Sequence, residues 1–228
     1  MKEDITINKL KKSFSKKDID EMEQRYRAAF INSLSGFKSG NLIGTIDLEN
    51  KSNQTNLAIF SSCFHLGASP ALLGLVSRPD ITARHTLENI IKNEVYTINH
   101  VNTQIFHKAH QTSARYPKST CEFEATGLTP EYIDNFEAPF VRESNLKIGM
   151  RLKDIVHIKM NETKIIIGEI NNIIINYNDS LPIDQNSGHI NIEKLDSIAI
   201  SGLDHYHSTK SLARLSYAKP GLTPKILK

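Results

Sequence analysis

The segment TNLAIFSSCFHLGASPALLGLVSRPDITARHTLENI, residues 55–90, carries the clearest structural pattern in this chain. It opens with an apolar run that ends at the hydroxyl pair Ser61-Ser62, and a second apolar run ends at Arg78-Pro79. Small and turn-forming residues separate the two runs, which is typical of neighbouring β-strands. The segment therefore predicts two strands joined by a short turn.

A helix is expected directly after the second strand. Leu87, Ile90 and Ile91 recur at helical spacing, and Thr82 or Thr86 is a candidate N-cap. The helix start then follows Arg78 within eight residues.

Further apolar, β-branched runs flank this segment and predict more strands. They are GNLIGTIDL (40–48), VYTINHV (95–101), RLKDIVHIKM (151–160), TKIIIGEINNIIIN (163–176) and GHINIEKLDSIAISGLDHYHS (188–208). The run 163–176 is apolar at most positions, so we expect a strand buried on both faces or crossing a barrel.

The remaining segments predict decorations around these strands. Ser15 and Asp18 mark a helix start near the N-terminus, and the amphipathic helix is expected to pack on the outside of the fold. Its apolar positions are Ile19, Met22, Tyr26 and Phe30. Residues 103–144 are polar and proline-containing, so we expect a helix and surface excursions there rather than core strands. The basic segment LARLSYAKPGLTPKILK (212–228) is expected to form a peripheral arm.

Many strands and few helices favour one closed, mainly β domain with peripheral helices. We expect an N-terminal helical extension at 1–29, the β domain at 30–207 and the C-terminal arm at 208–228. A doubly wound α/β fold is excluded, because strands and long helices do not alternate and no GxGxxG follows the first strand.

Composition narrows the class of protein. Hydrophobic residues make up 39% and charged residues 23%, as in ordinary globular domains. A net charge of +3 without a basic, aromatic-rich patch argues against nucleic-acid binding. No apolar run is long enough to span a membrane, and the first residues lack a secretory signal, so the cytoplasm is the expected location. Two unrelated cysteines, Cys63 and Cys121, indicate neither a disulfide framework nor a zinc site.

The segment 55–90 also contains the groups that a phosphorylated ligand needs. Arg78, Thr86 and a helix N-terminus supply positive charge, a hydroxyl and free backbone N–H groups for a phosphate. Ser61, Ser62 and the backbone of residues 56–58 could meet the edge of a planar polar ring. Each feature also occurs for purely structural reasons, so these residues leave open which phosphorylated ligand is bound.

Several blocks, in order over about residues 30–220, resemble the flavin reductase-like, FMN-binding family. The blocks are Asn56-Leu57-Ala58-Ile59-Phe60-Ser61, Gly67-Ala68-Ser69-Pro70, Arg78-Pro79, His85-Thr86-Leu87-Glu88-Asn89-Ile90, Ser113-Ala114-Arg115-Tyr116-Pro117, Glu122-Phe123, Gly127-Leu128, Ile166-Ile167-Gly168-Glu169-Ile170 and Gly202-Leu203-Asp204 with Tyr206. One departure is that many relatives carry Arg-Pro before the first barrel strand, where this chain has Lys38, which could substitute electrostatically.

The resemblance implies a six-stranded antiparallel Greek-key split β-barrel that forms a homodimer, with FMN in a groove near the dimer interface. It implies that the isoalloxazine edge meets Ser61, Ser62 and Cys63, and that the phosphate meets Arg78 and Thr86. The full set of expected cofactor-binding residues is Asn56, Leu57, Ala58, Ser61, Ser62, Cys63, Arg78, His85, Thr86 and Asn89. No catalytic acid or base is expected, because the flavin performs the chemistry.

The histidines offer a weaker alternative. His107 and His110 are spaced to share one helix face, but no third ligand joins them, so no metal site is expected. His205 and His207 are expected to point the same way from a strand, as a surface or interface pair.

Three functions follow from the resemblance. The first is an NAD(P)H-dependent flavin reductase that takes a hydride to bound FMN and passes electrons to an acceptor. The second is a non-enzymatic, flavoredoxin-like electron carrier reduced by a protein partner. The third, a barrel that has lost its cofactor and serves as a dimeric binding module, is disfavoured by the intact Ser61, Arg78 and Thr86. The choice of NADH or NADPH, the acceptor, and FMN as cofactor or exchangeable substrate stay open.

Overall fold

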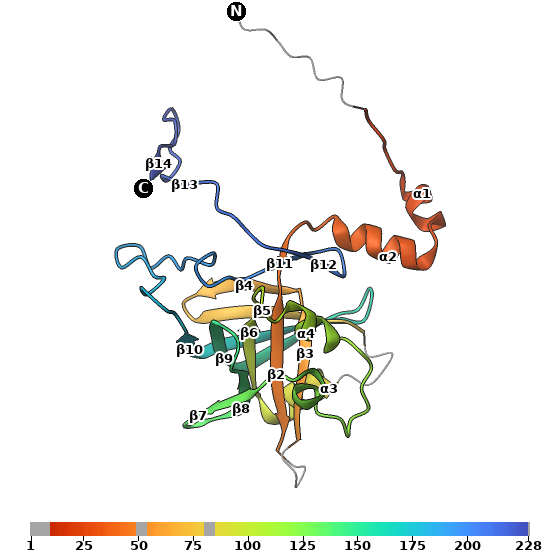
Figure 1. The fold of residues 1–228 in the computed structure, drawn as a ribbon. Coiled ribbons are helices and arrows are strands. Elements are labelled where there is room, and N and C mark those ends of the chain that lie inside the picture. Colours follow the sequence, from red (N-terminus) through yellow and green to blue (C-terminus); the bar gives the residue numbers. More distant parts are fainter. Residues whose placement is uncertain (1–9, 49–53, 80–84, 228) are drawn as a thin grey trace, which may run out of the picture.

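The fold is built on one antiparallel sheet of seven strands that curls around an apolar interior (Figure 1). The computed structural model describes residues 10–48, 54–79 and 85–227. The strand order is β3-β2-β6-β9-β10-β5-β4. The strands are β2 (Asn41–Asp47), β3 (Gln54–Phe60), β4 (Cys63–Ala68), β5 (Ala71–Ser77), β6 (Val95–His100), β9 (Leu146–Ile158) and β10 (Thr163–Ile175).

The connections give the sheet its crossed topology. β4 does not pair with β3, which precedes it. It pairs with β5, and β5 pairs in turn with β10, far along the chain, so β3 and β4 lie at the two edges of the sheet. The predicted mainly β architecture is confirmed. The resemblance implied six barrel strands, and that count is not confirmed, since the sheet here has seven.

The strand buried on both faces is β2. Its Leu42 packs in a cluster with Ile198 and Ile200, while Ile43 packs inside the barrel with residues such as Leu75. For residues 163–176 the sequence predicted a strand buried on both faces or one crossing a barrel. The first alternative does not hold, because β10 buries Ile166 but leaves Ile173 54% exposed. β10 forms part of the barrel wall, so only one of its faces points inward.

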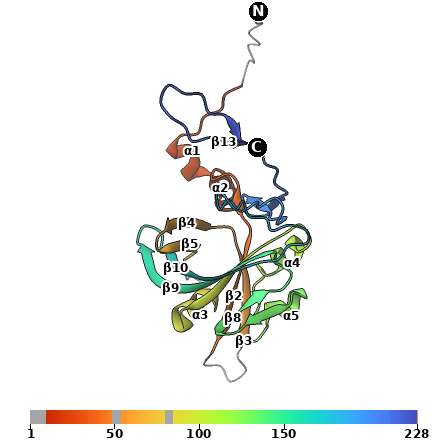
Figure 2. The ribbon, with the colours of Figure 1, turned by 90° about the vertical axis from the view of Figure 1, so that its left-hand side faces the viewer.

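The helix α3 (His85–Asn93) covers one end of the barrel interior (Figure 2). Leu87 and Ile90 enter the same apolar cluster as Ile43. The predicted helix is confirmed, but Thr86 is not its N-cap; it lies inside the first turn. The other candidate, Thr82, lies outside the described residues.

The polar segment 103–144 contains more core than its composition indicated. The expected helical part is present as α4 (Phe106–Gln111) and α5 (Glu122–Thr126). A hairpin follows, formed by β7 (Pro130–Ile133) and β8 (Phe136–Val141). Phe136 and Phe140 in β8 are buried, so the expectation of no core strand was wrong. Prolines are tolerated because this hairpin stands outside the main sheet, where fewer backbone donors are needed.

The N-terminal region forms two helices rather than one, α1 (Lys16–Glu21) and α2 (Gln24–Ser33). Ser15 and Asp18 form the expected capping box at α1. Glu23 then accepts hydrogen bonds from the backbone N–H groups of Arg25 and Tyr26, which starts a second helix. Neither helix has a buried residue, so the expected packing against the fold is absent in the described chain.

Short strands complete the structure. β1 (Lys38–Ser39), β11 (Ala199–Ser201) and β12 (His205–His207) form a three-stranded sheet, and β13 (Arg214–Leu215) pairs with β14 (Ile226–Leu227). The last pair lies away from the barrel (Figure 1). The boundaries at 29/30 and 207/208 stay predictions. In the described part of the chain, no helix has the length and apolarity needed to cross a membrane.

Candidate functional site

The expected site residues separate into two groups at opposite ends of β3. Asn56 lies near the start of the strand beside α3, whereas Ser61 and Ser62 follow its end. Five residues of extended chain span about 16 Å, so the two groups are not in direct contact. The structure therefore offers two polar positions joined by one edge strand.

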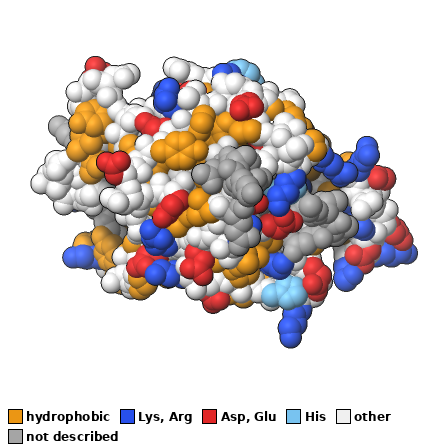
Figure 3. Space-filling view, turned by 90° about the horizontal axis from the view of Figure 1, so that it is seen from below, with side chains coloured by type: hydrophobic (Ala, Val, Ile, Leu, Met, Phe, Trp, Pro, Cys, Tyr) orange, Lys and Arg blue, Asp and Glu red, His pale blue; other side chains and the backbone are white. Residues whose placement is uncertain are grey.

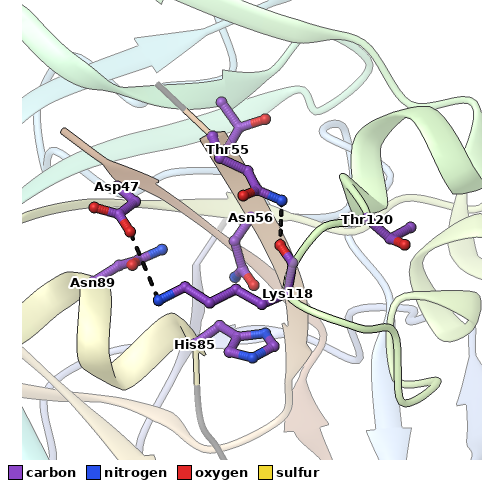
Figure 4. Close-up of a pocket in the computed structure, with 8 residues that line it drawn as sticks. Asp47, Thr55, Asn56, His85, Asn89, Lys118 and Thr120 are labelled. Carbon is purple, nitrogen blue, oxygen red and sulfur yellow. Dashed lines mark hydrogen bonds and ion pairs between the residues drawn. The ribbon is translucent and has the colours of Figure 1, made fainter. Parts of the chain in front are cut away.

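The first position is a pocket where the end of β2, the start of β3 and the start of α3 meet (Figure 4). Its lining comprises Asp47, Gln54, Thr55, Asn56, His85, Asn89, Lys118 and Thr120. Of the expected residues it thus contains Asn56, His85 and Asn89, but not Arg78. The sequence prediction missed the others; Lys118 and Thr120 lie in the 103–144 segment, where no helix or strand pattern indicated proximity.

Buried amides and hydroxyls tie α3 to the sheet behind this pocket. The Asn56 side-chain amide donates to Oγ1 of Thr86 over 2.9 Å, and the Asn89 amide donates to Oγ1 of Thr45 over 3.2 Å. Asn56, Thr86 and Asn89 are each at least 92% buried. Thr86 itself does not line the pocket; its hydroxyl oxygen accepts the Asn56 amide behind it.

Charged side chains frame the mouth of the pocket. Lys92 Nζ lies 2.8 Å from a carboxylate oxygen of Asp47. Lys118 Nζ is held more loosely, at 3.7 Å from Asp47 and 3.9 Å from Glu88, and its side chain is 55% exposed. Lys118 therefore provides a solvent-accessible positive charge near the N-terminus of α3, where anions are favoured.

The second position lies where β3 leads into β4. The Ser62 hydroxyl donates to the carbonyl of Val76 over 3.0 Å, and the Val76 N–H donates back to the Ser62 carbonyl over 3.2 Å. These bonds place Ser61-Ser62 beside the end of β5, next to Arg78. The expected neighbourhood of the serines and Arg78 is thus present, although Thr86 does not share it.

Two positively charged side chains, Arg78 and Lys38, influence each other at this second position. Arg78 is exposed and has no carboxylate partner among the described residues. Lys38 is held by the carbonyls of Asn32 and Gly202. Burial, and then the charge of Arg78, lower the pKa of Lys38. Among the described residues no carboxylate pairs with Arg78, and its positive charge favours an anion here, so the position fits a phosphate. Lys38 thus contributes positive charge near this position, as expected from the sequence.

The remaining expected residues have structural surroundings. Cys63 points into the barrel core, and burial raises the pKa of its thiol to about 11, so the thiol is protonated at neutral pH. The Leu57 side chain is fully buried, and its backbone N–H donates to Glu122 over 3.1 Å. Ala58 is half-buried beside it.

Glu122 is a functional candidate that sequence reasoning did not single out. It is 7% exposed and accepts the Leu57 N–H, which closes the free edge of β3. Burial raises the pKa of its carboxyl, while the hydrogen bond from Leu57 opposes that change. The carboxyl therefore holds the strand that joins both polar positions.

The other histidines do not gather at either position. His110 Nδ1 lies 2.8 Å from the hydroxyl oxygen of Tyr206, and His207 Nε2 lies 2.8 Å from that of Ser201. His205 pairs with Asp204 at 3.1 Å on the surface. The His110 contact joins α4 to β12, and the His207 contact joins β12 to β11. His85 is the histidine that lines the pocket.

Comparison with known proteins places this geometry in a family. The model of the flavin reductase like domain matches residues 34–188. A candidate flavin reductase with a split barrel domain from Shewanella frigidimarina NCIMB 400 is 51% identical, with a TM-score of 0.84 over 91% of this chain and 100% of that chain. An uncharacterized protein of Aquifex aeolicus (strain VF5) is 28% identical over 72% of this chain and 82% of its own length.

The flavoredoxin of Desulfovibrio vulgaris (Miyazaki F) has the same fold, with 20% identity and a TM-score of 0.64 over 82% of this chain and 92% of that chain. These similarities confirm the split barrel expected from the sequence. The family match spans more than half of the chain, and the Shewanella protein matches nearly all of it. The chain therefore belongs to the flavin reductase-like family of split-barrel proteins, and its function is flavin-related redox chemistry.

Proposed function

We propose that this protein binds FMN and acts as a flavin reductase, taking a hydride from NAD(P)H to the flavin and passing electrons to an acceptor. The observation that carries the proposal is the exposed Arg78 at the end of β5, beside Ser61-Ser62, in a chain of this family. In the described part of the chain this arginine has no carboxylate partner, and a phosphate would give it one.

The residues present fit FMN. Arg78 would hold the phosphate, with Lys38 adding positive potential from behind. Ser61 and Ser62 would offer hydroxyl and backbone groups to the polar edge of the ring. Lys118 and the N-terminus of α3, at the α3 pocket, form the second anion-favouring position and would accept a further anionic group of FMN or of the nicotinamide nucleotide.

When bound, the flavin supplies the two-electron chemistry. The protein binds and orients it, and we expect no acid or base from the chain. Cys63 fits this division of roles: burial raises the pKa of its thiol to about 11, so it adds an uncharged surface rather than a nucleophile. Glu122 accepts a hydrogen bond from the Leu57 N–H and so holds the edge of β3 in place.

One optical experiment tests the proposal. Purified protein, alone or after adding FMN, should show flavin absorption, and anaerobic NADH or NADPH should bleach it within seconds. A protein that takes up no FMN would refute the binding step.

The alternative is a flavoredoxin-like electron carrier, favoured by the similarity of fold to a flavoredoxin. It predicts slow bleaching by NAD(P)H and fast reduction by a ferredoxin-like protein partner. Measuring both reduction rates on the same flavin-loaded sample separates the two functions. Homodimer formation and a cytoplasmic location, both expected at the sequence level, stay proposals.

A further inference from the structure

Four ring-bearing side chains lie together on the surface where α4 meets β12 (Figure 1). We call this cluster the aromatic ridge; its members are Phe106, His107, His110 and Tyr206. The ring centroids of Phe106 and Tyr206 are 5.5 Å apart, and those of His110 and Tyr206 are 5.6 Å apart. Phe106 is 38% exposed, and both histidines are exposed. The ridge therefore offers ring faces and edges to a planar ligand.

One hydrogen bond orients His110 and leaves its other ring nitrogen available. His110 Nδ1 lies 2.8 Å from the hydroxyl oxygen of Tyr206. Burial, and then the charge of Asp204, raise the pKa of Tyr206 to about 12, so the hydroxyl keeps its proton at neutral pH and donates it to Nδ1. Neutral His110 then carries its own proton on Nε2. No described residue bonds to Nε2, so this N–H can donate to a ring nitrogen of a ligand.

The packing beneath the ridge holds it in place without using its outer side chains. Ala109, on the inner side of α4, is fully buried in a cluster with Leu42 and Ile200, and Tyr206 packs against that cluster. Phe106 and the two histidines lie on the outer side of the same helix. Removal of one of these outer side chains should therefore leave the core intact.

The ridge borders the end of the barrel where the flavin ring is expected. Lys38 pairs with Ile200 and Ile200 pairs with Tyr206, so the three residues lie side by side across the small sheet. Directly paired residues point to the same face, and two strand spacings amount to roughly 10 Å. β1 leads into β2, whose first residue pairs with the last residue of β3. Ser61-Ser62 follow directly after that residue.

The opposite face of the molecule has a different character. Seen from below, it carries acidic, basic and apolar side chains interspersed (Figure 3). Such a mixture is usual for the surface of a globular protein. The rings that contact one another and present hydrogen-bonding edges lie instead beside the expected flavin position.

The proposed hydride donor has a part that such a ridge would suit. Hydride transfer requires the nicotinamide ring to lie against the flavin, so the rest of the nucleotide must lie on protein surface nearby. That part consists of a pyrophosphate and an adenosine. Adenine is planar, carries ring nitrogens that accept hydrogen bonds, and stacks on Phe, Tyr and His side chains. Lys38, two strands from Tyr206, adds positive potential for the pyrophosphate.

We propose that the aromatic ridge binds the adenine ring of the nicotinamide nucleotide, with Phe106 as a stacking face and His110 Nε2 as a hydrogen-bond donor. The inference rests on the proposed function, because it names where the hydride donor of that reaction is held. The ridge is remote from the reacting atoms, so it contributes to the affinity for the donor and not to the hydride step.

The kinetic test compares two hydride donors on the FMN-loaded full chain. One is NADH or NADPH, whichever reduces the flavin faster, and the other is reduced nicotinamide mononucleotide, which lacks the adenosine. Phe106→Ala should raise the KM for the dinucleotide at least about fivefold, through loss of one base-stacking contact, with kcat unchanged. The KM for the mononucleotide should stay unchanged. His110→Ala should show the same selectivity, and its exposed side chain makes it a second variant whose fold is secure.

Tyr177→Ala is the matched control, because Tyr177 is an exposed aromatic residue after β10 and takes no part in the ring contacts of the ridge. It should leave both KM values unchanged. Circular dichroism of all three variants checks that the fold is retained.

Titration calorimetry with ADP-ribose, which contains the adenosine and both phosphates but no nicotinamide, makes the test independent of flavin reduction. Binding that Phe106→Ala weakens at least about fivefold supports the ridge, and it does so even if NAD(P)H does not reduce the flavin, in which case only the proposed function fails.

Four results would overturn the inference. They are no binding of ADP-ribose at millimolar concentration, an unchanged KM for the dinucleotide in both ridge variants, equal losses for the two donors, and a loss equal to that of the Tyr177→Ala control. A selective loss of FAD binding with unchanged dinucleotide kinetics would also overturn it, by assigning the ridge to the adenine of a flavin.

Discussion

Replacing Arg78 with alanine is the most direct test of the proposed phosphate position. The guanidinium is exposed, it has no carboxylate partner in the described chain, and it depresses the pKa of Lys38. Its removal breaks no ion pair and relieves a repulsion between cations. The free energy of unfolding should therefore stay within about 0.5 kcal/mol of the wild-type value.

The expected effect on FMN binding follows from the bonds that Arg78 would make. Charge-assisted hydrogen bonds contribute roughly 1.5–3 kcal/mol, equivalent to about a 10- to 150-fold change in dissociation constant. Because Arg78 is exposed, solvent screens its charge, so we expect a loss near the lower end of that range. Lys38 stays in place and continues to attract the phosphate, which also limits the loss.

The assay is titration of the apoprotein with FMN and with riboflavin, followed by flavin fluorescence. Arg78→Ala should weaken FMN binding and leave riboflavin binding unchanged, because only FMN carries the phosphate. Arg151→Ala is the control, since Arg151 is an exposed arginine on β9 bonded to Asn171 rather than at the site. A second variant, Lys118→Ala, reports on the α3 pocket.

Two results would refute the reasoning. Equal losses for FMN and riboflavin would mean that Arg78 supports the fold of the site rather than the phosphate. No loss in Arg78→Ala together with a selective loss of FMN binding in Lys118→Ala would place the phosphate at the N-terminus of α3 instead.

Two further predictions concern stability. Burial raises the pKa of Glu122 above its unfolded value of 4.5, so its favourable contribution is complete below that pH and is lost as pH rises through the folded pKa. The Glu122→Gln variant keeps an acceptor for the Leu57 N–H. Thermal melts should show that this variant is more stable than the wild type near pH 8, and the difference should vanish below pH 4.5. A difference in stability that does not depend on pH would contradict this prediction. Gly44→Ala would place a Cβ against the carbonyl oxygen of Pro139 and should lower the free energy of unfolding by about 3 kcal/mol. In the control Gly67→Ala, the Cβ would meet its nearest atom at 3.4 Å, so the melting temperature should stay nearly unchanged. Similar melting temperatures for both variants would show that β8 can move.

Local patterns in the chain were sufficient for most elements and for the family. Periodicity placed β2, β3, β5, β6, β10, α3 and the second half of β9, because strands and amphipathic helices repeat their apolar residues at characteristic intervals. It missed β4, which lies where a short turn between two strands was expected. The capping box at Ser15 was visible for the same reason, since it involves residues three apart. The ordered blocks were enough to indicate the flavin reductase-like family.

Which surfaces are covered could not be read from those patterns. β8 is a core strand although its surroundings are polar, because β6 and β2 happen to pack on it through Thr97 and Gly44. β10 is apolar at most positions, yet only one of its faces points into the barrel. Burial depends on partners distant in sequence, and no local window contains them.

The sequence also predicted a single site, whereas the folded chain has two separate polar positions. Residues 56–89 are contiguous and bear all the right groups, but β3 is extended, so Asn56 and Ser61 point to places about 16 Å apart. Lys38, Lys118 and Glu122 join these positions from elsewhere in the chain through contacts that only the packed barrel creates. Residue types and spacings thus indicated which kind of ligand the protein can bind. The path of β3 and the closure of the sheet determined the position of each side chain.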